Sequence, residues 1–405
     1  MRSSRLLDGR PARSLAVLFI GATVALASAC SSSNGGGAGG GGSTAPVKVG
    51  LVYSQTGLLA SYGKEYRQGF DAGLQYATNG TGSAGGHKIE IIPRDDAGDS
   101  AKGVSATKDL IGQGVKMIAG TVDSGIATQL APLAAQNQVL YISGPAATDA
   151  ITGINKYTFR SGRESYQDVK TAAAVVGDVS GKSVLVFAQD YEFGQANAKA
   201  VQQVLGGAGA KVSSLLVPLS AKDFTPFAQQ IKQKKPDLLF VAWAGDTTSA
   251  MWTALDQQGI FGIAKVITGL ADSASFNAYG SATTKIQFLA HYFPGAADNP
   301  VNTKMISLVK QAGGTPDLFT PDGFVAAQMV VHAVKTANGD SVDKMISALD
   351  GWTFQAPKGE QTVRAGDHAM VQPMFIATLQ KSGSSFEPKL VKSVPVNDVA
   401  PPSGS

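Results

Sequence analysis

Short apolar runs that alternate with helix-compatible segments are the feature of this chain that most constrains its fold. Such runs are typical of strands buried on both faces of a parallel sheet, with helices as the connections. They occur in two series. The first lies at residues 47–53, 89–93, 115–119 and 139–143, and the second at residues 183–188, 212–219, 237–243 and 265–268. The sequence therefore predicts an α/β fold with two parallel-sheet cores.

The chain between and after the two series indicates how the predicted lobes connect. Residues 157–164 (YTFRSGRE) carry Arg, Ser and Gly instead of a helical face, so we expect the first crossover there. After residue 290, helical stretches precede two strand-like runs, which a third domain would explain. We favour a return of these segments to both lobes, because the late strands lack a parallel series of their own. The expected lobes are residues 47–163 with 291–369, and residues 164–290 with 370–405.

The N-terminal 29 residues have the layout of a signal peptide. An apolar run at residues 15–26 is shorter than the roughly 20 residues that span a bilayer. It ends in small residues, and Cys30, the one cysteine in the sequence, follows directly. This junction resembles the bacterial lipobox, in which the cysteine receives a lipid before cleavage. Ordinary secretion with an incidental cysteine is the alternative. The basic residues ahead of the run are Arg2, Arg5, Arg10 and Arg13.

Residues 30–46 are predicted to be a lipidated Cys30 followed by a flexible Gly/Ser tether. We therefore expect the protein on the outer side of the bacterial cytoplasmic membrane, attached through a lipid anchor. Removal of residues 1–29 takes four of the 34 basic and one of the 30 acidic residues, which leaves a net charge of 30 − 29 = +1. A body so nearly neutral does not indicate a nucleic-acid partner.

The sequence shows no motif for catalysis, metal binding or a nucleotide cofactor. The four histidines lack metal-ligand spacing, and no G-x-S-x-G, Walker A or G-x-G-x-x-G motif follows a candidate strand. Asp95, Asp96 and Asp99 could form a cation site, but a turn that caps the helix after Asp99 is the favoured interpretation. We therefore expect no enzyme activity, no metal and no cofactor.

Two polar loops follow the third and fourth strands of the first series. They are residues 121–125 (TVDSG) and 143–148 (SGPAAT). Ligands of open α/β sheets bind at the carboxyl ends of the strands, where such loops meet. Helix N-termini together with the hydroxyls of Ser124 and Thr148 would suit a carboxylate. Plain helix capping is the alternative for each residue alone.

The chain resembles the leucine/isoleucine/valine-type periplasmic binding proteins over nearly its whole mature length. The segments that carry the resemblance are SQTGLLASYGKEYRQGFDAGLQYA, IPRDDAGDSAKGVSATKDLIGQGVKMIAG, SGIATQLAPLAAQNQVLYISGPAAT, DYEFGQ and VRAGDHAMVQPMFIATL. The resemblance implies a type I periplasmic binding protein fold, with two Rossmann-like lobes joined by a hinge. It also implies a monomeric solute-binding protein that closes on its ligand and delivers it to an ABC-type permease.

The resemblance also suggests which residues hold the solute. Ser124, Gly125, Ala146 and Thr148 match positions that bind an amino acid's carboxylate and ammonium, and Tyr62 matches an aromatic residue beside its side chain. On the second lobe we expect Phe193, which stands where a tyrosine is usual, together with Trp243 and Asp272. Asp272 is the candidate partner for the ammonium, with Asp246 as the substitute. His368 is expected to be structural.

The expected cargo is a small amino acid with an apolar side chain, such as a branched-chain one. Relatives with the same backbone carry amides, urea-like compounds or aromatic acids, which are therefore alternatives. A ligand-sensing receptor subunit would use the same fold and cleft. An enzyme of a related α/β fold would require turnover of a cleft ligand.

Overall fold

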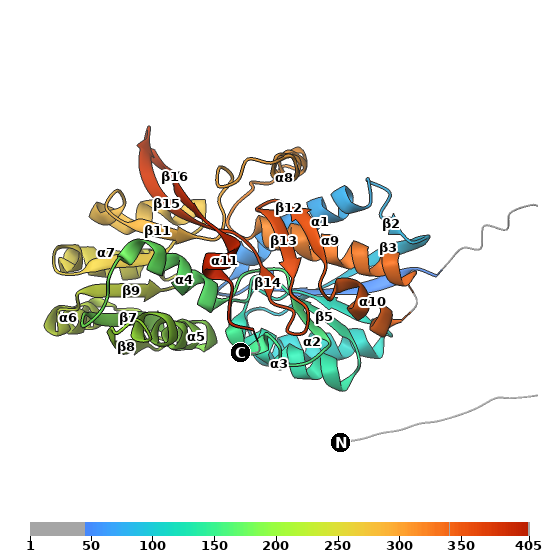
Figure 1. Ribbon diagram of the computed structural model, residues 1–405, viewed down its shortest axis with the longest axis horizontal. Helices are drawn as coiled ribbons and strands as arrows, with labels where there is room; N and C mark the ends of the chain where they lie inside the picture. Colours follow the sequence, from blue (N-terminus) through green and yellow to red (C-terminus); the bar gives the residue numbers. More distant parts are fainter. Residues whose placement is uncertain (1–44, 340, 404–405) are drawn as a thin grey trace, which may run out of the picture. The chain divides into compact units, whose positions relative to one another are not determined.

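The computed structural model describes residues 45–339 and 341–403, which form two large sheets and one small sheet (Figure 1). The predicted signal peptide, Cys30 and all but the last two residues of the tether lie outside the described residues. Within the described part, no helix is long and apolar enough to cross a membrane.

The first large sheet has six strands in the order β2-β3-β1-β4-β5-β6, all parallel except the short β2. Every residue of β4 and β5 is buried, because helices cover both faces. Helices α1 and α9 share a core with one face, and α2 and α3 with the other. The strands are β1 (Val47–Tyr53), β2 (Ser83–Ala84), β3 (His87–Asp95), β4 (Met117–Ala119), β5 (Leu140–Ser143) and β6 (Thr158–Arg160). Their helices are α1 (Ala60–Ala77), α2 (Ser100–Gly112), α3 (Ser124–Gln136) and the 3-10 turn η1 (Asp149–Ile151).

The second large sheet has seven strands in the order β16-β15-β11-β10-β9-β7-β8, of which β7 to β11 are parallel. Helices α4 and α5 cover one face, and α6 and α7 the other. The strands are β7 (Ser183–Gln189), β8 (Lys211–Val217), β9 (Leu238–Ala242), β10 (Lys265–Gly269), β11 (Gln287–Ala290), β15 (Met374–Ser382) and β16 (Ser385–Val394). The helices are α4 (Ser165–Val176), α5 (Glu192–Val201), η2 (Gln202–Gly206), α6 (Thr225–Lys234), α7 (Thr248–Gln257), η3 (Ile260–Gly262) and η4 (Ser273–Ala282).

The segments after residue 290 join both sheets. Helix α9 packs directly on α1, and a Cβ added at Gly69 of α1 would lie 1.8 Å from the Thr320 carbonyl oxygen, so only glycine allows this approach. Strand β15 pairs antiparallel with β11. The late elements are α8 (Pro300–Gln311), α9 (Thr320–Ala337), α10 (Val342–Leu349), β12 (Thr353–Ala356), β13 (Gly359–Val363), β14 (Met370–Val371) and α11 (Val396–Val399). The predicted α/β architecture with two mostly parallel sheets is confirmed, and the lobe boundaries stay a prediction.

Within the described residues, three chain crossings connect the half of the fold that contains the six-stranded sheet with the half that contains the seven-stranded sheet. One leads from β6 to α4, the second from β11 to α8, and the third from β14 to β15. The expected first crossover at residues 157–164 contains the short strand β6. Asp99 caps α2, because its carboxylate accepts a hydrogen bond from the Lys102 N–H at 2.8 Å. The acidic turn therefore acts as the helix cap that the sequence favoured.

Candidate functional site

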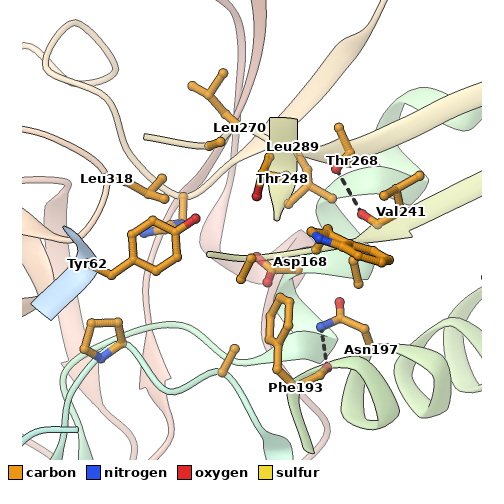
Figure 2. Close-up of a pocket in the computed structure, with 18 of the residues that line it drawn as sticks. Tyr62, Asp168, Phe193, Asn197, Val241, Thr248, Thr268, Leu270, Leu289 and Leu318 are labelled. Carbon is orange, nitrogen blue, oxygen red and sulfur yellow. Dashed lines mark hydrogen bonds between the residues drawn. The ribbon is translucent and has the colours of Figure 1, made fainter. Parts of the chain in front are cut away.

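A cavity lies between the two large sheets, where the carboxyl ends of their parallel strands face each other (Figure 2). The space open to the centres of water-sized molecules is about 80 Å³. One buried water needs roughly 10–15 Å³ on that measure. The cavity therefore has the size of a single small solute. This is also the place where open α/β sheets bind their ligands.

Four of the eight predicted solute-binding residues line this cavity: Tyr62, Ser124, Phe193 and Trp243. The Tyr62 ring packs edge-on against Phe319, with 4.7 Å between the ring centroids. Burial, followed by the nearby Asp272 carboxylate, raises the pKa of Tyr62 well above its ordinary value, so its phenol stays protonated. These side chains make one wall of the cavity aromatic.

Ser124 is the first residue of α3 and joins the two predicted loops. The helix begins there because the Asp123 carboxylate accepts a hydrogen bond from the Ile126 N–H at 3.0 Å. The Ser124 hydroxyl oxygen accepts hydrogen bonds from the N–H groups of Ala147 and Thr148 at 3.2 and 3.3 Å. The sequence thus predicted correctly that the loops meet, and their backbone donors already have a partner.

The other four predicted residues, Gly125, Ala146, Thr148 and Asp272, are not among those that line the cavity. The Ala146 carbonyl accepts a hydrogen bond from Arg160 Nη2 at 2.8 Å. The Thr148 hydroxyl donates to Glu192 Oε1 at 2.6 Å, and this bond joins the two halves of the fold.

Asp272 is buried at the start of η4, beside a separate hollow that Glu65 and Asp317 also border. Its Oδ1 has no hydrogen-bond partner among the described residues. Asp246, the substitute for Asp272, does not line the main cavity either. The structure thus brings neither carboxylate into the cavity wall.

Arg163 and Asp168 are cavity residues that sequence reasoning did not single out. Arg163 follows β6, is 6% exposed, and donates from Nη1 to the Pro145 carbonyl at 2.7 Å. Its Nε lies 3.3 Å from the Asp168 carboxylate, and its guanidinium lies over the Phe319 ring, 5.6 Å from the centroid. Burial raises the pKa of Asp168, while the Arg163 cation opposes that shift. The cavity therefore contains a buried ion pair.

His291 also lines the cavity and follows β11 directly. Burial, followed by the Arg163 charge, lowers its pKa well below the ordinary value, so the imidazole is neutral. Its Nε2 is buried without a hydrogen-bond partner among the described residues. A neutral imidazole nitrogen can accept or donate one hydrogen bond, so His291 offers unused capacity to a ligand.

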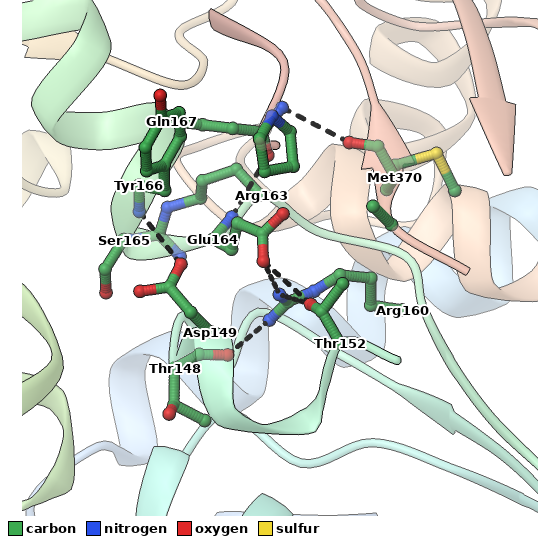
Figure 3. A network of polar contacts seen from close by, with 12 residues as sticks. Thr148, Asp149, Thr152, Arg160, Arg163, Glu164, Ser165, Tyr166, Gln167 and Met370 are labelled. Carbon is green, nitrogen blue, oxygen red and sulfur yellow. Dashed lines mark hydrogen bonds and ion pairs between the residues drawn. The ribbon is translucent and has the colours of Figure 1, made fainter. Parts of the chain in front are cut away.

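A second buried ion pair holds the loop behind the cavity in place (Figure 3). Arg160 Nη1 lies 2.9 Å from Glu164 Oε2, and both side chains are 1% exposed. Arg160 Nη2 donates to the carbonyls of Ala146 and Thr148 at 2.8 and 3.0 Å. Together with the hydrogen bonds from Arg163 to the Pro145 carbonyl and from Ser165 to the Ala147 carbonyl, these bonds fix the shape of the loop at residues 143–148.

The comparison with known families identifies the chain's relatives. Residues 46–384 match the family model described as "Periplasmic binding protein". The chain belongs to this family. The resemblance seen in the sequence is thereby confirmed, together with the type I periplasmic binding protein fold. Like its relatives, the protein is a periplasmic solute-binding protein of the kind that serves ABC transporters.

Two similar proteins concern amino acids. Leu/Ile/Val-binding protein homolog 6 of Brucella abortus is 26% identical over 347 residues, which are 83% of this chain and 88% of that protein. The solved structure of an ABC-type branched-chain amino acid transporter from Rhodopseudomonas palustris is 30% identical, with a TM-score of 0.73. That match covers 87% of this chain and 97% of the other. The periplasmic binding protein described here is therefore related to branched-chain amino acid binders.

A third similar protein carries a different ligand. It is a solute-binding protein of an ABC transporter from Rhodopseudomonas palustris, solved in complex with 3,4-dihydroxybenzoic acid. It is 25% identical with a TM-score of 0.76, and the match covers 87% of this chain and 98% of the other. Relatives of this periplasmic binding protein thus include an aromatic-acid binder.

Proposed function

We propose that this protein captures a small amino acid with an apolar side chain and delivers it to an ABC-type permease. The observation that carries the proposal is the cavity between the sheets, which combines apolar and aromatic walls with a few buried polar groups. That combination is typical of sites for small amphiphilic ligands. The relatives named for branched-chain amino acids support the same cargo.

Capture proceeds by closure of the two halves around the solute. Two sets of hydrogen bonds join the halves. Thr148 donates to Glu192, and the Ser273 N–H and hydroxyl donate to Asp317 Oδ2 at 2.9 and 2.5 Å. Such contacts form only when the halves approach, and a ligand that touches both halves favours that state. The closed form is the one that the permease recognises.

The proposed location is the outer side of the bacterial cytoplasmic membrane, where a lipid on Cys30 tethers a monomeric protein. The sequence at the Cys30 junction supports this anchor. Replacement of Cys30 by serine should release the protein from membranes and leave its affinity for solute unchanged. Retention of the Cys30→Ser protein in the membrane fraction would contradict the anchor.

An aromatic acid is the second candidate cargo. Phe193, Trp243 and Phe319 line the cavity, and a flat ring would pack well among them. The relative solved with 3,4-dihydroxybenzoic acid supports this candidate.

A ligand screen tests the proposal. The purified protein is heated with leucine, isoleucine, valine, phenylalanine, benzoate, 3,4-dihydroxybenzoate and acetamide, and each rise in melting temperature is followed by calorimetry. Ligand binding to the native state alone raises its stability. We expect the apolar amino acids to raise the melting temperature. A response to acetamide alone would contradict the proposed cargo.

A further inference from the structure

The charged groups that line the cavity are one cation and one anion, side by side. Arg163 and Asp168 are 6% and 3% exposed, and they contact each other only through Arg163 Nε, at 3.3 Å. Arg163 Nη2 makes no hydrogen bond to any described residue, and the carboxylate of Asp168 bonds to Arg163 alone among them. A guanidinium has five N–H donors and a carboxylate about four acceptor sites. Both groups therefore retain unused capacity.

The two charges that line the cavity balance, because Arg163 carries one positive charge and Asp168 one negative charge, and both side chains are buried. Arg160 is paired with Glu164, as described above. A bound monoanion would add an uncompensated buried charge, which is costly. A zwitterion adds one charge of each sign and keeps the balance.

We infer that Arg163 and Asp168 together form the subsite for the main-chain charges of an α-amino acid. The guanidinium receives the ligand's carboxylate, and the carboxylate of Asp168 receives its ammonium. His291 Nε2, which is buried and unpartnered among the described residues, supplies one further hydrogen bond. The ligand's side chain then lies among the apolar walls. This inference rests on the proposed function and names the residues that bind the ligand's charged groups.

The subsite is held in place before any ligand arrives. The Pro145 carbonyl and the Phe319 ring fix the Arg163 guanidinium. Asp168 belongs to the first turn of α4, where the Glu164 and Gln167 side chains cap the helix. A charged pair fixed in this way needs little reorganisation on binding, which favours affinity. Asp272 and Thr148 lie off the cavity wall and are not needed in this arrangement.

Matched ligands test the inference on the unmodified protein. Leucine is compared by calorimetry with 4-methylpentanoate, which lacks the ammonium, and with leucinamide, which lacks the carboxylate. Phenylalanine is compared with 3-phenylpropanoate in the same way. We expect each amino acid to bind about 10-fold to 100-fold more tightly than its altered partners, because each loses a charge-assisted hydrogen bond.

The variant Asp168→Asn separates recognition from a structural role. It should weaken the binding of leucine about 10-fold or more and leave the affinity for 4-methylpentanoate nearly unchanged, because that acid has no ammonium group that Asp168 could bind. Equal weakening of both ligands would show a structural role and overturn the inference. Asp178→Asn, an exposed change just beyond the same helix, is the charge-matched control and should alter neither affinity.

The outcomes of the ligand series distinguish the inference from the proposed function. If 4-methylpentanoate or 3-phenylpropanoate binds as tightly as its parent amino acid, the inference is overturned, while solute capture stands. If none of these probes nor any ligand of the screen binds, the proposed function fails and the inference with it. The series on the unmodified protein decides the matter even where Asp168→Asn does not fold.

Discussion

The hydrogen bond between Thr148 and Glu192 provides a direct test of closure. The Thr148 hydroxyl follows β5 in one half of the fold, and Glu192 begins α5 in the other. A hydrogen bond to a charged group contributes about 1.5–3 kcal/mol, and the lower value suits this half-buried pair. If the two halves close on the solute as proposed, this bond forms only in the closed form, and its loss should shift the closure equilibrium by about 1.5 kcal/mol, which corresponds to about tenfold. When the open form dominates without ligand, affinity falls by the same factor.

Thr148→Val removes the hydroxyl and keeps the shape of the side chain, whereas Thr148→Ser keeps the hydroxyl. The dissociation constant of the best ligand from the screen, measured by calorimetry, should rise about tenfold in the Thr148→Val protein and little in the Thr148→Ser protein. The hydroxyl also accepts a hydrogen bond from the Ala150 N–H at 3.2 Å. That local contact lies within one half and is lost in the open and closed forms alike. It therefore lowers stability without changing affinity.

A combination of variants shows whether the same bond is responsible. Glu192→Gln weakens the bond by removing the charge, so it should reduce the affinity of the parent protein. In the Thr148→Val background it should have almost no further effect, because the bond is already absent. If the losses of ligand affinity from the two changes add, or if Thr148→Val leaves the affinity unchanged, the role of this bond in closure is refuted.

Three further changes follow from the described contacts. Phe193→Tyr adds a hydroxyl to an apolar wall, and calorimetry should show about tenfold weaker binding of leucine if the hydroxyl stays unpaired. Gly63→Ala places a Cβ 1.8 Å from the Ser54 carbonyl oxygen and should lower the free energy of unfolding in urea by about 3 kcal/mol. Gly112→Ala, which meets no atom within 4 Å, is its control and should be neutral or stabilising. Burial lowers the pKa of Lys358 to about 7, so the unfolded chain binds more protons than the folded protein above that pH. The free energy of unfolding should therefore increase more between pH 7 and pH 9 in the parent protein than in the Lys358→Met variant. An equal gain would contradict the assignment.

The strand series was predictable because an apolar run between turns is a local signal. Strands β1, β7 and β9 lie where the sequence placed them. Strands β6 and β11 are only three and four residues long, and no long apolar run marks them in the sequence. They are recognised only by their pairing with neighbouring strands. The return of the late segments to both lobes was predicted, but the pairing of β15 with β11 joins residues about 90 positions apart, which no local pattern encodes.

The candidate site was predictable at the level of loops but not of side-chain direction. Ser124 and the loop at residues 143–148 meet, as strand ends in a parallel sheet must. The Thr148 hydroxyl points to Glu192 instead of the cavity, because its direction is set by a partner in the other half. Arg163 was visible within the expected crossover, and His291 stood alone in the sequence. Their place in the cavity wall depends on the tertiary fold.

Arg163 and His291 lie on chain crossings, between β6 and α4 and between β11 and α8, and on neither set of opposing strands. Points near the axis of a rotation travel least, so these two residues should keep almost the same environment throughout a cycle of opening and closing. Phe193 lies on α5, which belongs to one half alone, so it should move with that half relative to the other. Ligand preference can then change by replacement of residues that move with one half, such as Phe193, while Arg163 and His291 continue to contact every ligand.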